Sequence, residues 1–199
     1  MIRDIVFDIG WVFVGIHPER LLEFLVSHGA PRMDLPTAVE RIGLVEHETG
    51  RLDGAGLIER FISLAPQAPP DAVREHWLEM LTPHADMMQL ARQLMPHHGV
   101  YLLSNIGELH WDHLSVRHGV ADLGHGALTS FDAGVMKPDS AIYAQAEAKF
   151  GLRPASTVFI DDRAENIEAA RRRGWHGIVH RSFHDTREAL LRLGVEAAA

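Results

Sequence analysis

Four short apolar runs place the strongest constraint on the fold of this 199-residue chain. Each is too short for a helix and rich in β-branched or aromatic residues, which is typical of strands buried on both faces. Amphipathic helical patterns lie between the later runs, and this alternation predicts an α/β fold with a doubly wound parallel sheet, Rossmann-like in its arrangement. The apolar runs are residues 5–7, 100–103, 157–160 and 177–180, and the helical patterns are residues 108–118, 140–150 and 164–173.

The segment between the first and second runs is different in kind. It shows helical patterns over residues 18–28, 37–48, 54–65 and 70–81, separated by glycine and proline breakers, and no convincing strand. A crossover between parallel strands needs only about a dozen residues. We therefore expect residues 15–84 to form a small helical subdomain, called the cap below. Residues 1–14 and 85–199 then form the α/β core.

Composition narrows the classes of partner. With 27 acidic against 19 basic residues, the formal charge of −8 gives no basic footprint for nucleic acid or an anionic membrane. The absence of cysteine excludes disulfides and thiolate metal sites. There is neither a signal-peptide pattern nor a run approaching the ~20 apolar residues of a membrane span. We expect a cytoplasmic protein with no nucleic-acid or membrane partner; the sequence predicts no oligomeric state.

Polar residues follow three of the apolar runs at the point where each predicted strand ends. The first run ends at Asp8, the second at Ser104 and Asn105, and the third at Asp161 and Asp162. In an open α/β sheet, ligands bind outside the carboxyl ends of the strands. Residues distant in the sequence are therefore expected to converge on one pocket.

The residue types in this pocket point to phosphate chemistry. Several carboxylates brought together stay ionised only if a cation neutralises them, and an all-oxygen donor set favours Mg²⁺. Mg²⁺ is commonly held by one or two carboxylates and a substrate phosphate, and an aspartate can act as the nucleophile that forms an aspartyl-phosphate. Ser104 and Asn105, which precede a helix, can donate hydrogen bonds to phosphoryl oxygens, while Gly107 allows close approach of the backbone.

Four motifs in this order resemble those of the haloacid dehalogenase-like (HAD) hydrolase superfamily, in its capped phosphatase branch. The resemblance covers roughly residues 1–14 and 85–190, whereas the cap agrees with the family only in position and helicity. An Asp-x-Gly sequence in the first motif is similar to that of sugar-phosphate phosphatases. The motifs are Val6-Phe7-Asp8-Ile9-Gly10-Trp11-Val12, Leu103-Ser104-Asn105, Lys137-Pro138 and Ile160-Asp161-Asp162-Arg163-Ala164-Glu165-Asn166.

This resemblance implies a role for each matching residue at the metal. Asp8 is the implied nucleophile and also a metal ligand. The backbone carbonyl of Gly10 and the carboxylate of Asp162 are implied Mg²⁺ ligands, and Asp161 supports the metal directly or through water.

The same resemblance implies how the phosphoryl group is held. Ser104, Asn105 and Lys137 bind the transferring group, and Lys137 also neutralises charge beside the nucleophile as part of the catalytic machinery. Asn166 is placed like a residue that steadies the loop of the fourth motif.

One departure from the family pattern concerns proton transfer. Many phosphatases of the family carry a second Asp two residues after the nucleophile, where it protonates the leaving group and activates water, and this sequence has Gly10 there. General acid–base help is typically worth ~10²–10⁴-fold. We hypothesise that a residue of the cap supplies the proton instead. The candidates are His17, Glu19, Glu46, His47 and Glu48.

The sequence therefore predicts a Mg²⁺-dependent phosphatase acting on a small phosphorylated metabolite, with a sugar phosphate as the class implied by the resemblance. One alternative is a metal-independent 2-haloacid dehalogenase, in which Asp8 attacks carbon. Asp161 and Asp162 disfavour it, because adjacent carboxylates repel a haloacid carboxylate. A catalytically weak HAD-fold binding protein is the other alternative, because of Gly10.

Two histidines on the helical pattern of residues 108–118 admit a second metal site. His110 and His113 stand three residues apart, yet no third ligand has suitable spacing. We interpret them as part of a solvated helix face.

Overall fold

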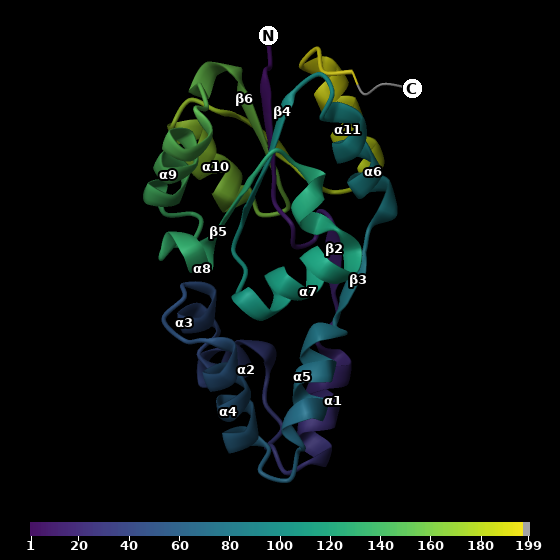
Figure 1. Cartoon of the computed structure of the whole chain (residues 1–199), viewed down its shortest axis with the longest axis vertical. Coiled ribbons are helices and arrows are strands. Elements are labelled where there is room, and N and C mark those ends of the chain that lie inside the picture. The colour runs from purple at the N-terminus through teal and green to yellow at the C-terminus, as the bar shows by residue number, and fades with distance from the viewer. Residues whose placement is uncertain (197–199) are drawn as a thin grey trace.

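A five-stranded parallel sheet forms the centre of the structure, a computed structural model that describes residues 1–196 (Figure 1). The strand order is β5-β4-β1-β6-β7, and every neighbouring pair is parallel. The predicted α/β fold and all four predicted strands are confirmed. The strands are β1 (Asp4–Phe7), β4 (Gly99–Ser104), β5 (Ala127–Thr129), β6 (Thr157–Asp161) and β7 (His176–Val179).

Helices cover both faces of this sheet, as the doubly wound prediction requires. Alternate strand residues explain why: Ile5 and Phe7 face one apolar core, and Val6 between them faces the other. Full burial of each such side chain is worth about 1.5–3 kcal/mol. Helices α6 (Ala85–Leu94) and α11 (Phe183–Arg192) contribute to the first core, and α9 (Ser140–Phe150) and α10 (Ala164–Arg172) contribute to the second.

One further helix, a short helix and two 3₁₀ turns complete the core. They are α7 (Glu108–His118), α8 (Ser130–Ala133) and the two 3₁₀ turns Val120–Leu123 and Pro154–Ser156. None of the helices within residues 1–196 has the length and apolar character needed to cross a bilayer.

Five helices of the cap lie at the end of the molecule opposite both termini (Figure 1). They bury an apolar core of their own around Leu57, Phe61 and Trp77, to which Leu109 of α7 also belongs. The cap is thus packed against α7 of the core. Its helices are α1 (Glu19–Ser27), α2 (Leu35–Ile42), α3 (Leu44–Glu48), α4 (Gly54–Leu64) and α5 (Pro70–Leu78).

An antiparallel ribbon of two strands connects these helices to the sheet. Strands β2 (Val14–Ile16) and β3 (Leu81–Pro83) pair with each other, so the expectation of no strand in residues 15–84 was wrong. Three residues are too few to show the period-two alternation by which a strand is recognised. Strand β2 crosses the first limit expected for the cap and β3 ends just before the second, and the division at residues 14/15 and 84/85 stays a prediction.

One helix predicted for the cap is two helices in the structure. The pattern over residues 37–48 is divided at Gly43, which has φ +65° and serves as the end of α2 and the start of α3. This left-handed conformation is one that glycine adopts at little cost. The break turns α3 away from α2 and toward the core, where α3 packs near α8.

Helix α7 holds the core and the cap together through polar contacts. The Glu108 carboxylate accepts a hydrogen bond from the backbone N–H of Gly54. His110 Nε2 donates to the carbonyl of Trp77 at 2.8 Å, and its ring stacks on the indole with centroids 4.2 Å apart. The interpretation of a solvated helix face was therefore wrong for His110, because packing against α5 buries its ring. Burial lowers the pKa of His110 to about 4, against the opposing effect of the Trp77 carbonyl.

The depressed pKa of His110 predicts a pH-dependent stability. In the unfolded chain, His110 binds a proton as the pH falls below its ordinary pKa of 6.5. In the folded chain, it binds that proton only near pH 4. This contribution is therefore present above pH 6.5 and is lost as the pH falls toward 4. We expect the free energy of unfolding to fall by about 2 kcal/mol more between pH 7 and pH 5 in the wild type than in His110→Phe. Urea unfolding at the two pH values measures this difference, and equal losses in both proteins would contradict it.

Candidate active site

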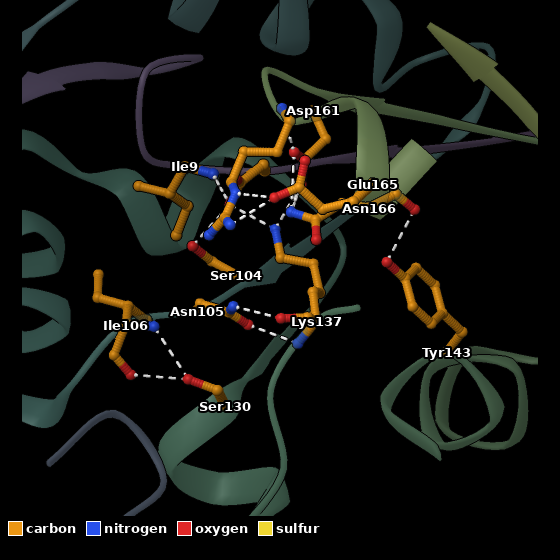
Figure 2. A network of polar contacts seen from close by, with 12 residues as sticks. Ile9, Ser104, Asn105, Ile106, Ser130, Lys137, Tyr143, Asp161, Glu165 and Asn166 are labelled. Carbon is orange, nitrogen blue, oxygen red and sulfur yellow. Dashed lines mark hydrogen bonds and ion pairs between the residues drawn. The ribbon is translucent and has the colours of Figure 1, made fainter. Parts of the chain in front are cut away.

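The carboxyl ends of three neighbouring strands bring the predicted site residues together. Asp8 follows β1, Ser104 is the last residue of β4, and Asp161 is the last residue of β6. Because β4 and β6 flank β1 in parallel, their ends meet at one edge of the sheet. Figure 2 shows Ser104, Lys137 and Asp161 pointing toward one another at this edge.

A buried ammonium group joins two of the carboxylates. Lys137, from the loop between α8 and α9, places Nζ 2.8 Å from Asp8 Oδ1 and 2.7 Å from Asp161 Oδ2. Its side chain is 1% exposed, and that of Asp161 is fully buried. Burial alone lowers the pKa of Lys137, but the charges of Asp8 and Asp161 outweigh burial and keep the pKa above its ordinary value. The amine is therefore charged at neutral pH and bridges the two carboxylates.

The carboxylate of Asp8 is oriented through one of its two oxygens. Besides Lys137, Oδ1 accepts hydrogen bonds from the backbone N–H of Ile9 at 2.7 Å and from Ser104 Oγ at 2.8 Å. Within residues 1–196, Oδ2 accepts none. Burial raises the pKa of Asp8 to about 7 and the charge of Asp161 adds to this effect, while Lys137 and Ser104 oppose it. The arrangement leaves one oxygen of a precisely held carboxylate available to a metal ion or a phosphorus atom.

The two aspartates at the end of β6, Asp161 and Asp162, have different hydrogen-bond partners. Asp161 accepts hydrogen bonds from Asn166 Nδ2 at 3.0 Å and from the backbone N–H of Arg163 at 2.8 Å, in addition to its ion pair. The carbonyl of Asn166 in turn accepts from the hydroxyl of Tyr143 at 2.9 Å (Figure 2). Asp162 is only partly buried and its side chain makes no hydrogen bond to another described residue. Asp161 is thus a structural anchor, and Asp162 is the carboxylate free to bind a ligand.

Asn105 is placed at the site, but its side chain contacts the protein backbone. Its amide accepts from the N–H of Lys137 at 2.8 Å and donates to the carbonyl of Lys137 at 2.9 Å (Figure 2). These two hydrogen bonds hold the Lys137 loop at the end of β4, so Asn105 positions the ammonium group. Its predicted contact with a phosphoryl group remains a prediction.

Ser130, a buried residue at the start of α8, was not predicted to contact the segment that follows β4. Ser130 Oγ accepts from the backbone N–H of Ile106 at 3.0 Å and donates to its carbonyl at 3.3 Å. The contact attaches the turn after β4 to the start of α8. A lone serine at a helix start carries no signal for such a partner 24 residues away.

The donor atoms at the site fit a magnesium ion. Asp8, Asp161 and Asp162 each offer a carboxylate oxygen within 4.8 Å of the others, and among residues 1–196 this is the one group of three potential metal ligands. When all three carboxylates are ionised, the positive charge of Lys137 offsets one of their three negative charges. Two net negative charges then remain in a largely buried space. Burial raises the pKa of Asp162, and the charge of Asp161 adds to this effect. An all-oxygen site with this excess of charge suits a divalent cation such as Mg²⁺.

The structure separates the five cap residues considered for proton transfer. His17 and Glu19 are exposed near β2, and Glu46 faces Arg60 at 4.0 Å. His47 Nδ1 lies 3.0 Å from the carbonyl of Leu52, and its ring packs on Gly107, where a Cβ would come within 2.2 Å of it. Glu48 differs from the other four because the charges of Asp8, Lys137 and Arg163 affect the pKa of its carboxyl group.

Comparison with known proteins gives consistent matches. A family model described as haloacid dehalogenase-like hydrolase matches residues 22–174. The chain is 27% identical over 176 residues to the sesquiterpene phosphatase astK of Aspergillus oryzae, covering 87% of each protein.

Two solved structures share the fold over nearly their whole length. A predicted HAD-like family hydrolase from Porphyromonas gingivalis has a TM-score of 0.83 at 25% identity, covering 98% of this chain and 99% of that one. The HAD family enzyme bt-2542 of Bacteroides thetaiotaomicron, solved in complex with magnesium and inorganic phosphate, has a TM-score of 0.82 at 21% identity. The alignment with bt-2542 covers 91% of this chain and 95% of that one.

The bridging role of Lys137 predicts a large loss of stability when the amine is removed. Lys137→Met leaves Asp8 and Asp161 buried without their shared counter-charge, which we expect to cost about 3–5 kcal/mol in free energy of unfolding. Lys149 is the only other lysine of the chain and is exposed, so Lys149→Met is the matched control, with an expected cost below about 1 kcal/mol. Chemical denaturation of the three proteins without divalent metal tests this, and equal losses for the two variants would refute the bridging role.

Proposed function

Because this chain belongs to the haloacid dehalogenase-like hydrolase family, we propose that it is a Mg²⁺-dependent phosphatase that acts through an aspartyl-phosphate intermediate. The observation that supports the proposal most directly is the pattern of contacts around the Asp8 carboxylate. Three donors hold Oδ1, Oδ2 accepts no hydrogen bond from the described residues, and two further carboxylates lie within reach of a shared cation. This is the arrangement that a carboxylate nucleophile beside a metal requires.

In the proposed reaction, Asp8 attacks the phosphorus atom of a phosphate monoester. Lys137 and Ser104 keep the nucleophile oriented, and the ammonium group of Lys137 offsets negative charge as the phosphoryl group approaches. Gly107 is the N-cap residue of α7, whose first N–H groups have no partner inside the helix and favour an anion there.

The metal site would be formed by Asp8, Asp162 and the backbone carbonyl of Gly10, with Asp161 behind them. Bound there, Mg²⁺ would act as a Lewis acid toward the phosphoryl oxygens and balance the charge of the carboxylates. The role of Asp161 is to hold Lys137 and the loop of residues 161–166 in place, since its oxygens already accept hydrogen bonds from Lys137, Asn166 and Arg163.

The proposed substrate is a small phosphorylated metabolite. The relative astK is a sesquiterpene phosphatase, and bt-2542 was solved with magnesium and inorganic phosphate, which supports phosphate as the common chemical group. The Asp-x-Gly sequence at Asp8 and Gly10 supports a sugar phosphate as the class. A substrate panel should therefore contain sugar phosphates, a prenyl phosphate and an aryl phosphate.

Phosphate release with and without Mg²⁺ tests the proposal directly. We expect release from at least one ester, abolished by EDTA and reduced about 10³-fold or more in Asp8→Asn, because the nucleophile is removed. Asp122→Asn, at an exposed carboxylate of the turn Val120–Leu123, is the control and should keep wild-type activity.

Two outcomes would contradict the phosphatase. One is phosphate release that is unchanged by EDTA and by Asp8→Asn. The other is release of halide from 2-haloacids without metal and no release of phosphate from any ester, which would identify a dehalogenase.

A further inference from the structure

We propose that Glu48, the last residue of α3 in the cap, is the general acid and general base of the proposed phosphatase reaction. This inference rests on the proposed function and assigns the proton-transfer step that the core leaves without a residue. Three features of the molecule support it: the absence of a side chain at Gly10, the packing of α3 on the core, and the surroundings of the Glu48 carboxyl group.

Position 10 lacks a side chain although there is space for one. A Cβ built on Gly10 meets nothing closer than Ile16 Cδ1 at 3.4 Å, an ordinary van der Waals contact. Lys137 pairs with two carboxylates, Ser104 donates to Asp8, and Asp162 belongs to the proposed metal site. A proton donor for the leaving group must therefore come from another element.

The end of α3 is seated on the core at points on either side of Glu48. His47, before it, packs on Gly107 at the start of α7. Gly50, after it, has φ +71° and a Cβ there would lie 2.4 Å from the carbonyl oxygen of Phe131 in α8. Only glycine allows this approach. These contacts place the α3 terminus beside the two segments that follow β4 and β5, next to the site.

The carboxyl group of Glu48 is partly buried, and within residues 1–196 it makes no hydrogen bond or ion pair. Burial raises its pKa to about 7, and the charge of Asp8 adds to this effect, while Lys137 and Arg163 oppose it. Charged residues of three core segments therefore affect the pKa of Glu48, and such electrostatic effects weaken with distance. A carboxyl group with a pKa near 7 can give up and regain a proton at neutral pH.

Neighbouring titratable groups are less suited to this role. Glu46 lies near Arg60 at 4.0 Å, and both side chains are more than two-fifths exposed. His47 is held by the Leu52 carbonyl and packed on Gly107. On α7, Glu108 is occupied with the backbone of Gly54.

Glu48 gives up a proton in the first of the two proposed steps and regains one in the second. Asp8 attacks phosphorus, the bond from phosphorus to the ester oxygen breaks, and the carboxyl group of Glu48 gives its proton to that oxygen, so that an alcohol leaves. The Glu48 carboxylate then takes a proton from water. The resulting hydroxide attacks the phosphorus of the aspartyl-phosphate, the bond to Asp8 breaks, and inorganic phosphate leaves with Asp8 ionised and Glu48 protonated again.

The isosteric variant Glu48→Gln tests this assignment with the full-length protein and Mg²⁺. We expect kcat for the best sugar phosphate to fall about 10²–10⁴-fold, with KM changed less than about threefold. With 4-nitrophenyl phosphate, whose leaving group needs little protonation, we expect a burst of nitrophenolate equal to the enzyme concentration, followed by slow turnover. The burst reports an accumulated aspartyl-phosphate, which a merely structural defect would not produce.

Matched variants complete the experiment. Glu46→Gln, on the same helix, should retain wild-type kinetics, and the unfolding midpoint of Glu48→Gln should stay close to that of the wild type. Gly10→Asp in the Glu48→Gln background should raise kcat about tenfold or more, because it returns a carboxyl group to the vacant position.

The outcomes separate the two proposals. Wild-type kcat in Glu48→Gln would overturn the assignment of Glu48, as would a raised KM with unchanged kcat or a defect cured by excess Mg²⁺. Each of these leaves the phosphatase intact. Absence of phosphate release by the wild-type protein would overturn the phosphatase itself.

Discussion

The ion pairs of one buried lysine hold the functional end of this molecule together. Lys137 reaches Asp8 at the end of β1 and Asp161 at the end of β6, so a single ammonium group joins two strands and a loop that are far apart in the sequence. Two carboxylates buried side by side would repel each other, and a buried charge without a partner costs several kcal/mol. The site is therefore stable only while the lysine stays in place.

Amide side chains keep the lysine in place without adding charge. Asn105 holds the backbone of Lys137 with two hydrogen bonds, and Asn166 holds the carboxylate of Asp161 with two more. Neutral donors are suited to this task because they satisfy buried oxygens without changing the electrostatic balance. The remaining negative charge is then carried at Asp8, whose Oδ2 accepts no hydrogen bond from the described residues, and at Asp162, an arrangement that suits the proposed divalent cation.

Much of the core could be predicted because parallel strands impose simple rules. Apolar runs predicted β1, β4, β6 and the edge strand β7, and the shared direction of β1, β4 and β6 placed Asp8, Ser104 and Asp161 at one edge. Strands β2, β3 and β5 could not be recognised, since three residues carry no clear period. Side-chain partners were equally hidden. The turn of Asn105 toward Lys137 and the burial of His110 depend on elements that pack from elsewhere in the chain.

The same limit explains why the cap residues could not be ranked from sequence. Glu46, His47 and Glu48 are consecutive, and the break at Gly43, the packing of His47 on Gly107 and the contact of Gly50 with α8 together bring the end of α3 to the core. If Glu48 transfers the proton, the groups required for catalysis are divided between two parts of the chain. The nucleophile then lies on the rigid sheet and the acid lies on the cap. Protonation of the leaving group then requires the cap to be seated, which couples the chemistry to exclusion of water from the pocket.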